Sequence, residues 1–169
     1  DSLYAVLPEE VRNNRTLLST MQIVDNIKGL PPAPFVTFTG GDPAIQDEVA
    51  PLIYHLNLAG MKVAVETQGQ YFPDWLEICD VLTFSPKGPS SGNIVEIRDL
   101  ELYLQNWMFS RPFKACIKVV VFDEHDFEYA MEVYREIPSV MYDSFYFTAG
   151  TPMTAESPLE RTALVLQNE

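Results

Sequence analysis

The stretch Phe35-Val36-Thr37-Phe38-Thr39-Gly40-Gly41-Asp42-Pro43 decides the fold expected for this chain. Its first four residues are mostly aromatic or β-branched, a composition that favours a strand. The glycine pair and the Asp-Pro pair then end that strand in a turn. Residues 45–59 repeat apolar side chains at helical spacing, and residues 62–66 form a second compact apolar run. A strand, a helix and a strand in this order predict a parallel βαβ unit.

The same alternation continues on both sides of this unit. Further strands are expected at 80–84, 117–122 and 144–148, and helices at 16–28, 99–109 and 124–137, with Asp99 and Asp123 as N-caps. Ser157-Pro158-Leu159-Glu160 has the composition of another helix start. Apolar strands joined by helical crossovers predict an α/β protein with a parallel sheet, either an open doubly wound sheet or an incomplete barrel. We expect one domain, 1–169, that is truncated at both ends.

Composition excludes several classes of function. The 169 residues are 47% apolar and carry a net charge of −13, and the eleven Lys and Arg residues are scattered. Nucleic-acid binding is therefore not expected, because it needs clustered basic side chains. No stretch approaches the roughly 18 consecutive apolar residues of a membrane helix, so neither a membrane span nor a membrane partner is expected.

The cysteines and histidines have ordinary structural explanations. Cys79 and Cys116 lie in apolar segments without further ligands at metal-binding spacing, which predicts two buried free thiols in a reducing, cytoplasmic compartment. They cannot ligate an iron–sulfur cluster alone, since such clusters take three or four cysteines. His55 and His125 are expected within helices, and we assign them no role.

Polar residues and glycines follow the expected strands, where ligands of parallel α/β proteins bind. The Gly40-Gly41 pair could expose its backbone to a ligand or simply form a turn. Asp42 could bind a ligand or cap the next helix. Glu66 ends a buried strand, so its carboxylate needs a cationic or hydrogen-bonding partner. Lys87 could pair with a ligand carboxylate or be a solvated loop residue.

Three motifs together resemble the 7-carboxy-7-deazaguanine synthases, radical S-adenosylmethionine (SAM) enzymes of queuosine and 7-deazaguanine biosynthesis. They are Phe38-Thr39-Gly40-Gly41-Asp42-Pro43-Ala44-Ile45-Gln46, Val65-Glu66-Thr67-Gln68-Gly69 and Phe84-Ser85-Pro86-Lys87-Gly88-Pro89-Ser90-Ser91-Gly92, and Lys118-Val119-Val120-Val121 with Asp126-Phe127 is also similar. Each motif is weak alone, but their order and spacing are specific. The resemblance implies a partial, TIM-like radical SAM barrel.

The resemblance also implies roles for individual residues. SAM would be bound by Gly40, Gly41, Asp42, Ser85, Pro86, Lys87 and Thr148. The substrate pterin would be bound by Asp1, Thr39 and Glu66. The family has Asp-Thr and then Tyr after its Cys-x-x-x-Cys-x-x-Cys motif, and Asp1-Ser2-Leu3-Tyr4 looks like that tail. Ser2 would then bind Mg²⁺ through its hydroxyl oxygen, and the cluster cysteines would lie upstream of Asp1. Asp42 stands where many radical SAM enzymes carry Glu, and Thr148 departs from the common forms of its motif.

The implied activity is that of a lyase. A [4Fe–4S] cluster would cleave SAM reductively, and 6-carboxy-5,6,7,8-tetrahydropterin would be converted to 7-carboxy-7-deazaguanine with help from Mg²⁺. Implied partners are the pterin and a reductant such as flavodoxin or ferredoxin, and the family often forms homodimers. Without cluster ligands this stretch by itself is expected to be inactive. The alternatives are a radical SAM enzyme for another substrate, such as an activase, and a non-catalytic barrel fragment or binding module.

Overall fold

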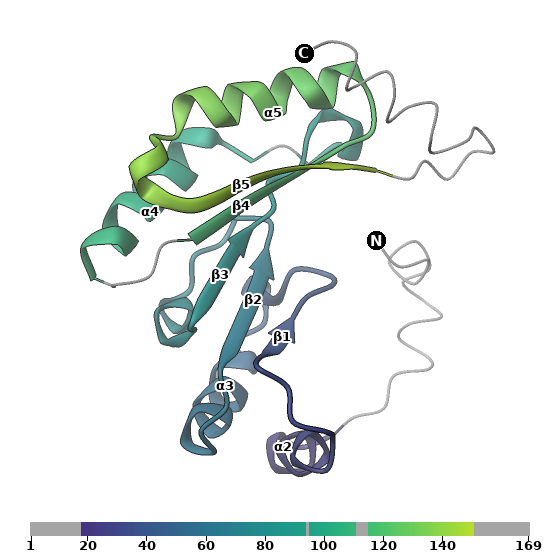
Figure 1. Ribbon diagram of the computed structural model, residues 1–169, viewed down its shortest axis with the longest axis vertical. Coiled ribbons are helices and arrows are strands. Elements are labelled where there is room, and N and C mark those ends of the chain that lie inside the picture. Colours follow the sequence, from purple (N-terminus) through teal and green to yellow (C-terminus); the bar gives the residue numbers. More distant parts are fainter. Residues whose placement is uncertain (1–17, 94, 111–114, 151–169) are drawn as a thin grey trace, which may run out of the picture. The chain divides into compact units, whose positions relative to one another are not determined.

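A computed structural model describes residues 18–93, 95–110 and 115–150. Its five strands form one sheet in the order β1-β2-β3-β4-β5, and the β1–β2, β3–β4 and β4–β5 pairs are parallel. Figure 1 shows helices in the connections between the strands. The strands are β1 (Val36–Phe38), β2 (Val63–Thr67), β3 (Val81–Phe84), β4 (Ala115–Val121) and β5 (Tyr142–Ala149). The predicted α/β class is therefore confirmed.

Four α-helices and four short 3₁₀ turns complete the described part of the chain. The α-helices are α2 (Thr20–Lys28), α3 (Val49–Leu58), α4 (Ile97–Ser110) and α5 (Glu124–Glu136). The 3₁₀ turns η2 (Pro43–Ile45), η3 (Asp74–Ile78), η4 (Pro89–Ser91) and η5 (Ser139–Met141) lie in the connections. None of the helices in the described ranges is long and apolar enough to cross a membrane. The helix expected from Ser157 lies outside these ranges.

The chain divides into two compact units. Unit 1 comprises the described residues up to Glu66 together with Pro73–Leu82, and unit 2 comprises Thr67–Phe72 and the described residues from Thr83 onward. The expectation of a single domain stays a prediction. The core of unit 1 joins α2, α3 and the strands through fully buried aliphatic side chains: Val24, Ile53, Leu56, Val63, Val65, Leu76 and Leu82.

Unit 2 is a layer of helices on a sheet. Along β4, Ala115, Ile117, Val119 and Val121 are buried, while the residues between them are half-buried. This period of two is that of a strand with one fully covered face. Helix α5 packs on β4, as Figure 1 shows, and it contributes buried Ala130 and Val133. At the end of β3, buried Phe84 packs edge-on against Tyr103, whose ring stacks on Phe72 at 4.3 Å between centroids.

Three predicted helix starts are wrong, each for a local reason. Helix α2 begins at Thr20 rather than residue 16, because Ser19 and Gln22 form a reciprocal capping box. The helix predicted over 45–59 is instead a 3₁₀ turn followed by α3, and Ile45 is 55% exposed rather than in the core. Asp99 lies within the first turn of α4 and is not its N-cap. Asp123 does cap α5, with its side chain accepting from Asp126 N at 3.0 Å.

Phe84→Ala is expected to lower the free energy of unfolding by about 3–5 kcal/mol, because it leaves a cavity beside Phe72 and Tyr103. Chemical denaturation measures this change. Tyr71→Ala is the control, since Tyr71 is 55% exposed, and it should cost less than about 1 kcal/mol. Equal losses in the two variants would contradict the packing described for unit 2.

Candidate functional site

The glycine turn after β1 is open to a ligand. Gly40 and Gly41 have φ of 81° and 57°, in the left-handed region that side chains other than glycine rarely adopt. A Cβ at either position would meet nothing within 4 Å, so backbone conformation rather than crowding requires glycine here. Thr39, Gly40 and Gly41 are all exposed. The turn therefore presents its backbone where a small molecule can approach it.

Asp42 stabilises the chain directly after this glycine turn. It is buried, with 8% of its surface exposed, and its Oδ1 accepts from Ala44 N at 3.1 Å to cap η2. The capping role considered for Asp42 is thus the one that the structure shows. A carboxylate held in this way fixes the direction in which the chain leaves the glycine turn.

Glu66 lies at the same end of unit 1 as this turn. Phe38 pairs with Val65 in the parallel register of β1 and β2, so Thr39 and Glu66 are the next residues on neighbouring strands. Glu66 is half-buried, and the strand continues one residue further to buried Thr67. Unit 1 thus brings together three of the predicted contacts: Thr39, the Gly40-Gly41 pair and Glu66.

The segment after β3 places the predicted serine and lysine together in unit 2. Ser85 is 1% exposed, and its backbone N donates to Thr67 O at 2.7 Å. Pro86 is also buried, and Lys87 is half-buried with its Nζ 3.5 Å from Ser85 Oγ. The ammonium group therefore lies at the strand end, and the binding role expected for Lys87 stays a prediction.

An amide cluster that the sequence did not reveal joins two loops of unit 2. Asn93 Nδ2 donates to Gln68 Oε1, and Gln70 Nε2 donates to Asn93 Oδ1, both at 2.6 Å. These bonds tie the turn after β2 to the loop after β3. No local pattern signals the cluster, because its members are 23 and 25 residues apart in sequence.

The buried polar side chains of the described residues collect next to strand ends. They are Asp42, Thr67, Ser85 and Asp126. Asp42 follows β1, Thr67 ends β2, Ser85 follows β3 and Asp126 lies in the first turn of α5, after β4. Burying polar groups is costly unless each finds partners, so within each unit these residues mark the carboxyl ends of its strands as candidate binding positions.

The remaining predicted residues are placed differently. Thr148 lies in β5, where it pairs with Val120 of β4, and it is exposed. Its predicted contact with SAM stays a prediction. Asp1 and Ser2 lie outside the described residues. Cys79 is buried, whereas Cys116 is only half-buried, so the prediction of two buried free thiols holds for Cys79 alone. Within the described ranges, no group of three or more His, Cys, Asp or Glu side chains could hold a metal ion.

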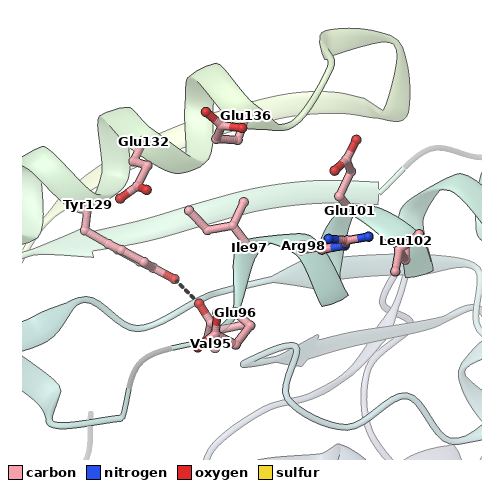
Figure 2. A pocket seen from close by; sticks show the side chains of 9 residues that line it. All are labelled: Val95, Glu96, Ile97, Arg98, Glu101, Leu102, Tyr129, Glu132 and Glu136. Atoms are coloured by element: carbon pink, nitrogen blue, oxygen red, sulfur yellow. Dashed lines mark hydrogen bonds between the residues drawn. The ribbon is translucent and has the colours of Figure 1, made fainter.

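A cavity of about 560 Å³ in unit 2 lies between α4, α5 and the segment before α4. Figure 2 shows that Glu96, Glu101, Glu132 and Glu136 line it together with Arg98. Tyr129 Oη donates to Val95 O at 3.1 Å, and burial raises the pKa of Tyr129 to about 12. None of the predicted site residues lines this cavity, so we place the candidate site at the strand ends.

The fold of this chain is shared with a protein of known structure. The structure matches the crystal structure of QueE from Escherichia coli with a TM-score of 0.61, over 99% of this chain and 67% of that chain, at 21% identity. This likeness shows the fold: a parallel α/β sheet with helical crossovers. None of the protein-family models matches the chain.

Sequence similarity points to one group of enzymes. The chain is 39% identical over 107 residues to the 7-carboxy-7-deazaguanine synthase of Bacillus cereus, 34% over 116 residues to that of Bacillus subtilis and 31% over 125 residues to that of Koribacter versatilis. These matches cover 63%, 68% and 70% of this chain. This chain is thus homologous to the 7-carboxy-7-deazaguanine synthases, as the motifs predicted. It spans 44–50% of the length of these relatives.

Both thiols are expected to react slowly in the folded protein. Burial, helped by the charge of Asp143, raises the pKa of Cys116 above its usual value, and Cys79 is 1% exposed. Because the thiolate is the reactive form, iodoacetamide at pH 8 should alkylate both at least about tenfold more slowly than in the urea-unfolded chain. Mass spectrometry over time measures the two rates. Equal rates for Cys116 in folded and unfolded chains would contradict this environment.

Proposed function

We propose that this chain is part of a radical SAM enzyme that converts 6-carboxy-5,6,7,8-tetrahydropterin to 7-carboxy-7-deazaguanine, in the biosynthesis of queuosine and other 7-deazaguanines. The observation that carries this proposal is the exposed Thr39-Gly40-Gly41 turn beside Glu66 at the carboxyl end of β1 and β2. The chain is homologous to 7-carboxy-7-deazaguanine synthases, which makes the pterin the first substrate to test.

The residues after β1 and β3 have the chemistry that SAM requires. The backbone of Gly40 and Gly41 would receive the amino and carboxylate end of SAM, with Asp42 holding the turn. Lys87, held near Ser85 Oγ, would pair with the carboxylate through its ammonium group. The Ser85-Pro86 segment would contact the ribose, and Thr148 completes the proposed set. When bound, SAM supplies the radical chemistry of the reaction.

Thr39 and Glu66 would orient the pterin. Its pyrimidine ring carries an amino group next to a ring N–H, and an ionised carboxylate accepts two such hydrogen bonds side by side. A half-buried carboxylate such as Glu66 makes these bonds stronger than an exposed one does. Asp1 would contribute a further oxygen. Orientation of this kind is the protein's usual share in cofactor chemistry.

The described residues do not provide a cluster site, because they contain only Cys79 and Cys116 and no suitable group of ligands. We therefore assign the [4Fe–4S] cluster to a Cys-x-x-x-Cys-x-x-Cys motif upstream of Asp1 and Mg²⁺ to Ser2. A flavodoxin- or ferredoxin-like reductant and a homodimer belong to the same proposal.

The reading frame upstream of Asp1 tests the enzyme directly. We expect three cysteines at this spacing, and a protein that includes them should cleave SAM to 5′-deoxyadenosine after reconstitution with iron and sulfide without air. Chromatography of the products measures the cleavage. Replacing the three cysteines with alanine should abolish it. A reading frame without these three cysteines would contradict the proposed enzymatic function and favour a binding module.

Glu66→Ala tests the substrate. Loss of charge-assisted hydrogen bonds should lower kcat/KM for the carboxypterin by about tenfold to a hundredfold, while SAM affinity and the melting temperature stay close to those of the wild type. Glu48→Ala is the matched control, since it removes the same charge from an exposed position of unit 1. Wild-type turnover by Glu66→Ala would remove this residue from the site. Normal cleavage of SAM without turnover of the carboxypterin by the wild type would favour a different substrate.

A further inference from the structure

Asp126 is a fully buried carboxylate that the proposed chemistry leaves without a role. It is 0% exposed and occupies the third position of α5, after the N-cap Asp123. Its Oδ1 accepts from Ser90 N at 3.0 Å, and its Oδ2 accepts from Ser90 Oγ at 2.6 Å and from Phe122 N at 3.0 Å. These three bonds, with the positive end of the helix dipole, offset the cost of burying a charge.

The partners of Asp126 come from two elements. Phe122 directly follows β4, whereas Ser90 belongs to η4 and lies 36 residues before Asp126 in the chain. The backbone of the earlier loop also comes very close, because a Cβ on Gly88 would lie 2.5 Å from Asp126 Oδ1 and 3.0 Å from its Cγ. Only glycine at position 88 allows this approach. The contact between the Asp126 carboxylate and the Gly88 backbone therefore depends on the absence of a side chain at position 88.

The loop that Asp126 holds is the continuation of the segment that carries Lys87. Gly88 is the next residue, and Ser90 is three residues beyond Lys87. Ser91 Oγ donates to Gly88 O at 2.7 Å and accepts from Asn93 N at 3.0 Å, so the loop is closed on itself between these residues. Fixing Gly88 and Ser90 against α5 thus limits the positions that the Lys87 backbone can adopt.

Capping of α5 does not explain Asp126. The N-cap is Asp123, whose side chain accepts from the backbone N of Asp126. The N-cap bond of α5 is thus already made by Asp123, and an acidic side chain in the first turn gains the dipole interaction without being buried. None of the three bonds that Asp126 accepts comes from α5: two come from Ser90 and the third from Phe122 N, which precedes the helix. The buried carboxylate of Asp126 therefore binds the Gly88–Ser90 loop.

We propose that Asp126 is a positioning residue, which holds the Gly88–Ser90 loop so that the Lys87 ammonium stays at the end of β3 and can meet the carboxylate of a bound ligand. The identity of that ligand as SAM rests on the proposed function, whereas the restraint of the loop is a property of this chain. Asp126 acts through Lys87 and does not itself contact the ligand.

The first test follows the loop by hydrogen–deuterium exchange, which needs no cofactor. In Asp126→Ala, amides between 85 and 93 should exchange at least about tenfold faster than in the wild type, because Ser90 N loses its acceptor. Glu124→Ala is the matched control: it removes an exposed carboxylate from the first turn of the same helix, and the amides of 85–93 should keep their wild-type exchange. Unchanged exchange in Asp126→Ala would overturn the restraint.

The second test uses the dissociation constant of SAM in the cluster-loaded protein, kept without air. Lys87→Ala and Asp126→Ala should each raise it by about tenfold or more, whereas Glu124→Ala should change it by less than about twofold. The double variant should bind about as weakly as Lys87→Ala alone, because the two residues act in series. Losses that multiply in the double variant would show that Asp126 does not act through Lys87.

Two further results separate the possible failures. If the wild-type protein binds no SAM, the proposed function fails and this role for Lys87 fails with it, whatever exchange shows for the loop. If the wild type binds SAM and Asp126→Ala binds it equally well, only the role of Asp126 is overturned. Should Asp126→Ala not fold, Ser90→Ala removes the 2.6 Å bond from the exposed side of the pair, and it should raise both the exchange of 85–93 and the dissociation constant in the same direction.

Discussion

Parallel strands cannot be joined by a hairpin, so the chain must cross back over the sheet after each strand before it can begin the next one. Every strand of a parallel sheet therefore ends at the edge where a crossover begins. In unit 1 this rule places the turn after β1 next to Glu66, because Phe38 and Val65 are paired. The polar residues gather at strand ends for the same reason, since the strand interiors are filled by apolar side chains such as Val63, Val65 and Ile117.

The strand ends are also where buried polar side chains need hydrogen-bonding partners. Asp42, Thr67, Ser85 and Asp126 are buried although each could be hydrated at a surface. Each is compensated locally: Asp42 caps η2, Thr67 Oγ1 accepts from Gly69 N, Lys87 Nζ lies near Ser85 Oγ, and Asp126 accepts bonds from Ser90 and Phe122. Buried polar groups that find such partners hold their own loops in place. Rigidity at a strand end is useful for a site that must hold a cofactor and a substrate in one orientation.

The sequence predicted much of this arrangement and failed where short-range signals compete. Strand ends were predicted to within about two residues, because apolar runs and turn residues are strong signals. The helix over 45–59 was predicted from its apolar spacing alone, yet Asp42 and Pro43 start a 3₁₀ turn first and leave Ile45 exposed. The N-cap assignment succeeded at Asp123 and failed at Asp99, since one acidic residue in a first turn does not show where that turn begins.

The residue types of the candidate site, their order along the chain and their place after strands were determined by the sequence itself, because turn chemistry and apolar periodicity are local. The resemblance to the 7-carboxy-7-deazaguanine synthases followed from the same motifs, and the sequence similarity to known synthases bears that resemblance out. Only the tertiary structure decided which side chains meet over long distances. The Gln68–Asn93–Gln70 cluster and the bonds between Asp126 and Ser90 join residues 23 to 36 positions apart. Contacts of that kind depend on how the strands pair and how the helices pack, and no pattern in the neighbouring residues encodes them.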